Sequence, residues 1–154
     1  MVSSQAVTSL GVEGAFNRIN HYSLAQVREK LLMERKVDEA IIDTAISEFR
    51  KYLSLIALGH KGIGMISRDV DEVWHTFILF TRDYTDFCNE VFGRYIHHQP
   101  SVPSQPLGNE PRRLFVDAYR QNFGDLPPIW RADGGTCFSS CSTPSTNCQE
   151  PSCK

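Results

Sequence analysis

The sequence predicts a mostly α-helical fold, a compact bundle of five or six helices with a disordered Cys/Ser/Thr-rich C-terminal tail. Apolar residues recur at steps of three and four along much of the chain, which is the period of a helix with one buried face. Glycines follow several of these stretches, where helices commonly end. The composition then changes at Gly134 to a run without a core-forming pattern. We therefore predict a flexible arm at 1–14, a helical domain at 15–132 and a disordered Cys-rich tail at 133–154.

The overall composition is that of one ordinary globular domain. The chain has 154 residues, of which 41% are hydrophobic and 22% are charged, so it can bury a real core. Its net charge of -2 gives no basic surface of the kind that nucleic acids bind. No apolar run approaches the roughly 20 residues that span a bilayer, and the first residues lack the features of a secretory signal. We expect a cytoplasmic protein that binds neither nucleic acid nor membrane, and we leave its oligomeric state open.

Residues 23–34 and 38–58 predict two scaffold helices, which follow a short helical segment at 15–20. Ser23 opens a capping box for the first of these helices, and Asp38 can cap the second. The second helix carries a long apolar stripe: Ile41, Ile42, Ala45, Ile46, Phe49, Leu53 and Ile56.

Two further helices are predicted at 68–80 and 81–92, with Ser67 and Thr81 as their N-caps. Because they are joined tightly, we expect them to form an αα-hairpin. Each helix carries a polar pair at four-residue spacing, Asp71 and His75 on the first and Tyr84 and Cys88 on the second. In a hairpin, the pair on one helix would face the pair on the other.

The remaining ordered chain is predicted to consist of a proline-rich loop at 94–111 and a last helix at 112–123. Gly124 ends that helix, and residues 126–130 are expected to be extended. We expect Trp130 to pack back on the bundle, because an indole of that size is rarely left in water.

The polar residues of the hairpin and of the loop after it predict a metal site. The candidate ligands are Asp71, His75, Cys88 and His98, with His97 as the alternate to His98. Imidazole, thiolate and carboxylate together make a tetrahedral zinc set, and their softness favours zinc first and iron(II) second over magnesium or calcium. Asp71 could instead orient a ligating imidazole without touching the ion. Tyr84 is a candidate donor to a developing anion.

Several other function classes are disfavoured by the absence of their motifs. Thr76 follows His75, so the zinc-protease pattern H-E-x-x-H is not present. The sequence has no P-loop, no G-x-S-x-G and no Cys-x-x-Cys, and the G-x-G at 62–64 follows no predicted strand. The plainer alternative is that the histidines and Cys88 are core or surface residues of a protein-binding adaptor.

The run from Val70 to Thr76 and the polar residues after it resemble the glycine-rich domain-containing protein family. The resemblance covers roughly Phe49 to Trp130, and Trp74–His75 is its most specific part. Many relatives carry a second His where this chain has Phe77. The resemblance implies a fold and a site but no reaction, and it rests on these matching residues: Asp71, Trp74, His75, Tyr84, Cys88 and His98.

The tail supports a hypothesis of another class. Four of the five cysteines lie in it, among many Ser and Thr residues: Cys137, Cys141, Cys148 and Cys153. A double glycine followed by such a run resembles the junction between leader and core in a modified precursor peptide. In such a peptide, Ser and Thr are dehydrated and then attacked by Cys thiols, which gives thioether rings. Alternatively, the tail is a flexible segment that binds metal weakly or is incidental, and its cysteine spacing fits no standard zinc ribbon. A protein partner could also bind through it.

Overall fold

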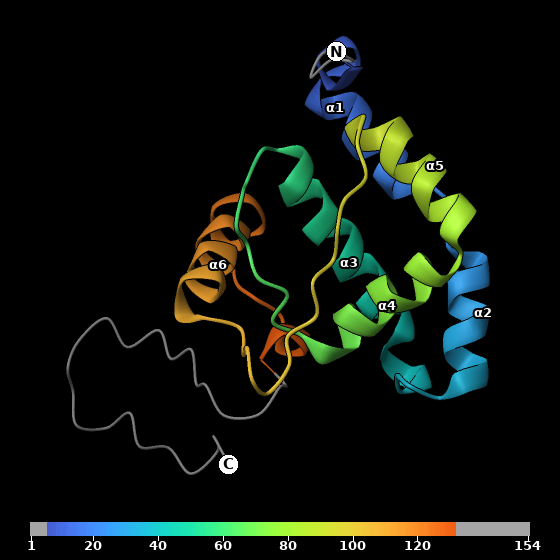
Figure 1. Ribbon diagram of the computed structural model, residues 1–154, viewed down its shortest axis with the longest axis vertical. Helices are drawn as coiled ribbons and strands as arrows, with labels where there is room; N and C mark the ends of the chain where they lie inside the picture. Colours follow the sequence, from blue (N-terminus) through green and yellow to red (C-terminus); the bar gives the residue numbers. More distant parts are fainter. Residues whose placement is uncertain (1–5, 132–154) are drawn as a thin grey trace, which may run out of the picture.

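The computed structural model describes residues 6–131, which form a bundle of α-helices (Figure 1). Within this range there are six α-helices and two short 3-10 helices, and the only β contact is a single bridge between Val102 and Gln105. The mostly α-helical prediction is therefore confirmed. The elements in order are α1 (Ala6–His21), α2 (Ala25–Glu34), η1 (Glu39–Ile41), α3 (Ile42–Ala57), α4 (Arg68–Leu79), α5 (Thr81–Phe92), α6 (Asn109–Phe123) and η2 (Pro128–Trp130).

Helix α3 is the centre of the bundle, and α1, α2, α4 and α6 all pack against it (Figure 1). Its stripe at helical spacing accounts for this position, because Ala45, Phe49 and Leu53 are almost completely buried. The side chain of Arg50, on the same helix, donates hydrogen bonds to the carbonyls of Ile19 and Tyr22. These bonds satisfy backbone acceptors where α1 ends, so α1 is fixed to α3 by polar as well as apolar contacts.

Two of the four predicted helix caps form as expected. The side chain of Ser67 accepts from the backbone N–H of Val70, and that of Asp38 accepts from Ala40 at 3.0 Å, although Asp38 opens η1 and not α3 itself. The capping box at Ser23 is wrong, because α2 starts from Leu24 without a side-chain cap. Thr81 is also not a cap, since it is already the first residue of α5.

The predicted antiparallel hairpin of α4 and α5 is wrong. Only Phe80 separates the two helices, and its ψ of 67° breaks the helical path. One residue is too short a connection to reverse the chain, for which two to five residues are usual. Figure 1 shows α5 turning away from the axis of α4 at this point. The polar pairs on the two helices therefore do not face each other.

The chain start differs from the predicted arm at 1–14. Helix α1 begins at Ala6, and its path is kinked at Gly11, where φ is 65°. Residues 1–5 and the tail predicted at 133–154 lie outside the described residues, so the division of the chain into arm, domain and tail stays a prediction. No helix between residues 6 and 131 has the length and apolar character needed to span a membrane.

A buried carboxylate joins the end of the described chain to the centre of the bundle. Glu48 of α3 accepts hydrogen bonds from the hydroxyl of Tyr119 and the indole of Trp130, both at 2.7 Å. Lys51 donates to the other carboxylate oxygen at 2.8 Å. The expectation that Trp130 packs back on the bundle is confirmed, since only 1% of it is exposed. The segment predicted as extended contains the 3-10 turn η2, which brings the indole to Glu48.

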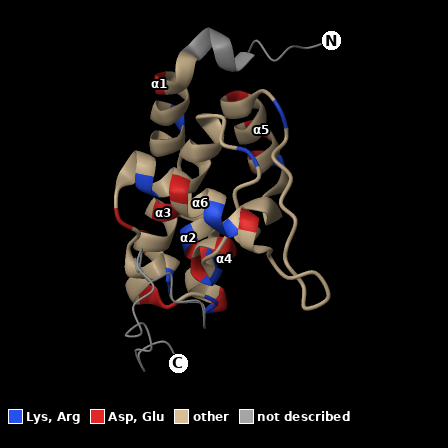
Figure 2. Ribbon diagram, turned by 90° about the vertical axis from the view of Figure 1, so that its left-hand side faces the viewer, with Lys and Arg blue, Asp and Glu red and all other residues tan. Residues whose placement is uncertain are grey.

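Two irregular segments cover the face of the bundle beside α4. Residues 58–67 link α3 to α4, and residues 93–108 link α5 to α6. The N–H of Gly64 in the first segment donates to the carbonyl of Pro111 in α6 at 2.9 Å, and Gly64 also lies against the side chain of Leu107 in the second segment. Residues 95–109 contain no Lys, Arg, Asp or Glu, so the long loop between α5 and α6 is tan in Figure 2. This uncharged loop carries His98 to the surface of α4.

Candidate metal centre

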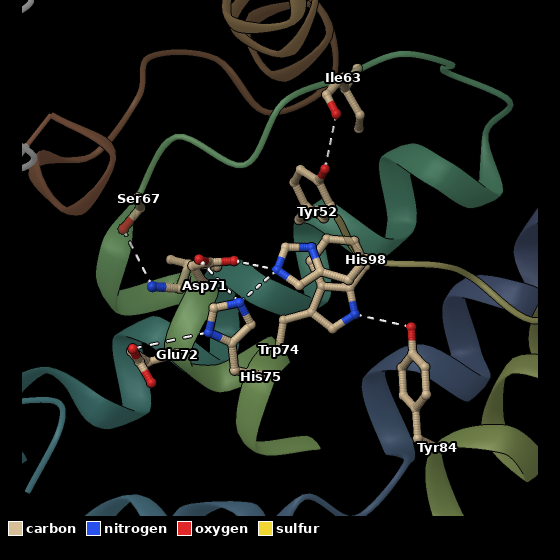
Figure 3. A network of polar contacts seen from close by, with 10 residues as sticks. Tyr52, Ile63, Ser67, Asp71, Glu72, Trp74, His75, Tyr84 and His98 are labelled. Carbon is tan, nitrogen blue, oxygen red and sulfur yellow. Dashed lines mark hydrogen bonds and ion pairs between the residues drawn. The ribbon is translucent and has the colours of Figure 1, made fainter. Parts of the chain in front are cut away.

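Three of the predicted ligands converge at one point between α4 and the long loop (Figure 3). Asp71 and His75 are four residues apart on α4 and therefore lie on the same face. His98 approaches them from the loop, so that one ligand atom from each of the three residues lies within 4.8 Å of the others. The Nε2 atom of His98 is 2.9 Å from Asp71 Oδ1, and His75 Nε2 is 3.4 Å from Asp71 Oδ2.

The two imidazoles meet through the nitrogens that commonly bind metals. His75 Nε2 and His98 Nε2 are 2.7 Å apart, which is a hydrogen-bond distance. At that distance only one nitrogen can carry the shared proton, so the other presents a lone pair. Zinc with ligand bonds of 2.0–2.1 Å sets neighbouring ligand atoms about 3.3 Å apart in a tetrahedron. His75 is the more exposed of the two rings, and a small rotation of it would increase the distance between the two Nε2 atoms to this value.

The carboxylate of Asp71 is placed where negative charge is stabilised. It lies in the first turn of α4, at the positive end of the helix dipole. Its Oδ1 is buried, and among the described residues no hydrogen bond of good geometry reaches it, although His98 Nε2 is close enough for an ion pair. A buried carboxylate oxygen without a well-aligned donor is costly unless a positive charge is near. A cation between Asp71 and the imidazoles would provide that charge.

The position of His98 is fixed by a buried network that starts at Trp74. The imidazole of His98 stacks on the indole, with ring centroids 4.1 Å apart. The indole N–H donates to the hydroxyl of Tyr84 at 3.0 Å, and this hydroxyl donates to the carbonyl of Ile96 at 2.5 Å. Tyr84 thus joins α4 to the loop two residues before His98. Its hydroxyl is already used in this way, which leaves no support for the predicted role of Tyr84 as a donor to an anion.

Two residues near the centre were not identified in the sequence. The Oε1 atom of Glu72 is 4.0 Å from His75 Nδ1, the ring nitrogen on the far side from the cluster, which is longer than a hydrogen bond. The sequence signal that could have identified Glu72 is its position three residues before His75 on the same helix. Tyr52 of α3 lies beside Trp74, with centroids 5.4 Å apart, and burial raises the pKa of its hydroxyl, with a smaller contribution from Asp71. Nothing in the local sequence relates Tyr52 to the site.

Cys88 and His97 lie outside the cluster that the structure forms. Cys88 is fully buried on α5, near the hydroxyl of Tyr84 and the carbonyl of Ile96, and burial raises the pKa of its thiol. The imidazole of His97 packs against the ring of Tyr95. Both imidazoles border the same pocket, but only that of His98 has a ring nitrogen close to Asp71. The four-ligand set with a Cys88 thiolate is thus reduced to two imidazoles and one carboxylate.

A pocket of about 540 Å³ opens beside the cluster. Asp71, Trp74 and His98 form its floor, and the two irregular segments form its walls. A volume of this size is typical of small-molecule sites. Its lining includes no Lys or Arg, so it offers no fixed positive charge from the described residues to an anionic ligand. Besides His98, the loop contributes four polar side chains to the pocket lining: His97, Gln99, Ser101 and Gln105.

A family model matches residues 15–114, which is most of the chain. The chain belongs to the UCP032817-like family. The matched range contains the whole cluster of Asp71, His75 and His98. The family is uncharacterised, so membership in it assigns no reaction. Neither the curated proteins nor the solved structures include a match.

The resemblance to the glycine-rich domain-containing protein family is therefore wrong, since the matching model is UCP032817-like and nothing indicates the other family. The pattern around Trp74–His75 is short, and an amphipathic helix with a polar pair four residues apart can arise in unrelated folds. The comparison of Phe77 with a second histidine in those relatives is withdrawn with it. Phe77 is a core residue with 2% of its surface exposed.

Proposed function

We propose that this protein is a metal-binding helical domain whose ion is held by Asp71, His75 and His98. The observation that carries the proposal is the convergence of one carboxylate and two imidazole nitrogens within 4.8 Å. Lone polar residues in a core usually find a single hydrogen-bond partner each. Here three potential ligands from two separate elements share one point, and a buried oxygen of Asp71 lacks a well-aligned donor.

Zinc is the first choice of ion and iron(II) the second. Two imidazoles and one carboxylate form both a known zinc set and the facial triad of non-haem iron(II) sites. Calcium and magnesium are disfavoured because they prefer oxygen ligands throughout. An ion held by three protein ligands keeps a further position, at which it can act as a Lewis acid on a bound oxygen. The pocket floor at Asp71 and His98 is the side from which that position would be reached.

Elemental analysis of the purified full-length protein, combined with zinc and iron(II) titration, tests this proposal. We expect about one equivalent of zinc per chain. His98→Ala and His75→Ala should each weaken binding more than the roughly 10- to 100-fold that loss of an outer-shell partner causes. His97→Ala is the matched control, because His97 is adjacent in sequence but packs on Tyr95 outside the cluster. It should bind zinc as the unchanged protein does.

Stability measurements provide an independent test, because metal binding to a folded site adds to the free energy of unfolding. Zinc should raise the melting temperature of the unchanged protein and of Cys88→Ala, but not that of His98→Ala. If His98→Ala binds zinc with unchanged affinity and gains the same stability from it, the cluster is not the metal centre. If zinc binding is lost in Cys88→Ala alone, the ligand set proposed here is wrong.

A further inference from the structure

The pocket beside the proposed metal centre gives access to the position that the three ligands leave free. Asp71 and His98 line the pocket, so an ion bound to them would be reached from it. A divalent ion held by one carboxylate and two neutral imidazoles keeps a single positive charge. A molecule that binds this ion through one oxygen, neutral or singly charged, therefore leaves no excess negative charge at the centre.

Away from the ion, the pocket has no positive charge to offer a ligand. Within residues 6–131, its lining contains no Lys, Arg or Glu, and Asp71 is its only carboxylate. The Nε atom of Arg112 is 3.5 Å from the carbonyl oxygen of Leu107, but Arg112 is not part of the lining. A phosphate or a second carboxylate on a bound molecule would thus lose water without gaining a charged partner, which is costly.

The walls of the pocket suit a molecule with an apolar body and uncharged polar groups. The half-buried apolar side chains on the walls are those of Ile63, Met65 and Leu107. The exposed amide and hydroxyl groups are those of Gln99, Ser101 and Gln105. Amides and hydroxyls both donate and accept hydrogen bonds, so they can pair with the carbonyl and hydroxyl groups of an uncharged molecule.

The wall formed by the long loop is held in place by the chain itself. The N–H of Gln105 donates to the carbonyl of Val102 at 2.8 Å, and the N–H of Val102 donates back to Gln105 at 3.3 Å. Prolines also restrict the backbone φ of this loop, at Pro100, Pro103 and Pro106. A pocket that is formed before its ligand arrives loses little binding free energy to the ordering of its walls.

We infer that the pocket binds a small organic molecule with an uncharged body, one oxygen of which fills the open position of the ion. The inference rests on the proposed function, because it needs the ion held by Asp71, His75 and His98. Carbonyl compounds, amides and alcohols belong to this class of ligand. Phosphorylated molecules and dicarboxylates do not, because their second charged group would have no partner in the pocket.

Two hydroxamates of nearly the same shape test the inference, since a hydroxamate binds zinc through its oxygens as a monoanion. The first is para-carbamoylbenzohydroxamate, whose distal group is neutral, and the second is para-carboxybenzohydroxamate, whose distal group is an anion. Full-length, zinc-loaded protein is titrated with each compound by calorimetry near pH 8, where carboxylates are fully ionised. We expect the neutral compound to bind about 10-fold tighter than the anionic one. Acetohydroxamate, which lacks the ring, should bind more weakly than the neutral compound.

Gln105→Arg tests the effect of charge directly, because it places a cation on the wall of the pocket. The variant should bind para-carboxybenzohydroxamate about 2- to 5-fold tighter than the unchanged protein does, which is the gain typical of an exposed ion pair. Gln121→Arg is the matched control, since it makes the same substitution at an exposed position of α6 that does not line the pocket. It should leave the affinities for both hydroxamates unchanged.

The outcomes separate this inference from the proposed function. Zinc binding with equal affinity for the two hydroxamates, or with no binding of either, would leave the metal centre in place and overturn the inference. Equal gains in Gln105→Arg and Gln121→Arg would also overturn it, as would equal affinity of the zinc-loaded and metal-free protein for the neutral compound. Absence of zinc binding in the unchanged protein would refute the metal centre and, with it, the inferred ligand.

Discussion

The imidazole of His98 lies on the indole of Trp74, with the two ring planes 28° apart. This contact matters because His98 belongs to a loop, and a loop residue must be held in place before it can serve a site on a helix. Trp74 provides the surface, and its N–H recruits Tyr84, which holds the loop backbone at Ile96. The geometry of the candidate centre therefore depends on residues that do not touch the proposed ion.

Tyr84→Phe should weaken metal binding without removing a ligand. The variant loses the donor to the Ile96 carbonyl and the acceptor for the Trp74 indole, and leaves both groups buried. We expect the free energy of unfolding to fall by about 1–3 kcal/mol and zinc affinity to fall about 10-fold or more. Tyr95→Phe is the control, because Tyr95 contacts Tyr84 through its ring and is partly exposed. Zinc titration and urea unfolding measure the two effects, and equal behaviour of the two variants would contradict the positioning role.

Glu48→Gln should destabilise the fold and leave the metal centre unaffected. The carboxylate accepts from Tyr119, Trp130 and Lys51, and an amide nitrogen in its place would face these donors with another donor. We expect a loss of about 1–3 kcal/mol in the free energy of unfolding. Glu29→Gln, on the exposed face of α2, should change it by less than about 0.5 kcal/mol. Urea unfolding of both variants measures these changes. A smaller loss of unfolding free energy in Glu48→Gln than in the control would show that Glu48 does not stabilise the end of the described chain.

Gly64→Ala should disturb the pocket wall. A Cβ at this position would lie 2.9 Å from the side chain of Leu107, closer than Cβ contacts in proteins, and 3.1 Å from that of Pro111, a tight contact. Overpacking of this kind costs about 1–3 kcal/mol of unfolding free energy. The double variant with Leu107→Ala removes the closer contact, so the effects of the two substitutions should be less than additive. Thermal unfolding of the two single variants and the double variant gives the coupling free energy between the two substitutions. Strict additivity would show that the contact with Leu107 does not cause the destabilisation.

Alkaline pH should destabilise the folded chain. Burial raises the pKa of the Cys88 thiol and of the Tyr52 and Tyr84 hydroxyls, so folding favours their neutral forms. Below the ordinary pKa values of about 8.5 for Cys and 10 for Tyr, this contribution to stability is fully present. Above them the unfolded chain ionises first and binds fewer protons, so the free energy of unfolding falls as pH rises. Urea unfolding between about pH 7 and pH 11 measures this, and a constant or rising stability would contradict it.

The sequence predicted most helices because the relevant information is local. The stripe on α3 and the caps at Ser67 and Asp38 each involve residues within a few positions of one another. The pairing of Asp71 with His75 followed from helical spacing in the same way, and His98 was included because its loop directly follows α5. Metal binding and the identity of the ion stay predictions.

The parts that were mispredicted depend on geometry between elements. Cys88 was assigned to the site on the assumption that α5 runs back along α4, whereas the single residue Phe80 directs α5 elsewhere. Glu48 gave no local signal, because its partners Tyr119 and Trp130 are 71 and 82 positions away in the chain. Such contacts are set by how helices pack, which residue spacing alone does not determine.

The bond from Trp130 to Glu48 also limits how this chain can be shortened for experiments. The range matched by the family model ends at residue 114 and includes Glu48, Asp71, His75 and His98. A fragment cut there would keep all three proposed metal ligands but would lose both Tyr119 and Trp130, so the Glu48 oxygen that accepts from them would be left without either donor. We expect such a fragment to aggregate or to be degraded during expression, and its failure to bind zinc would then say nothing about the ligands.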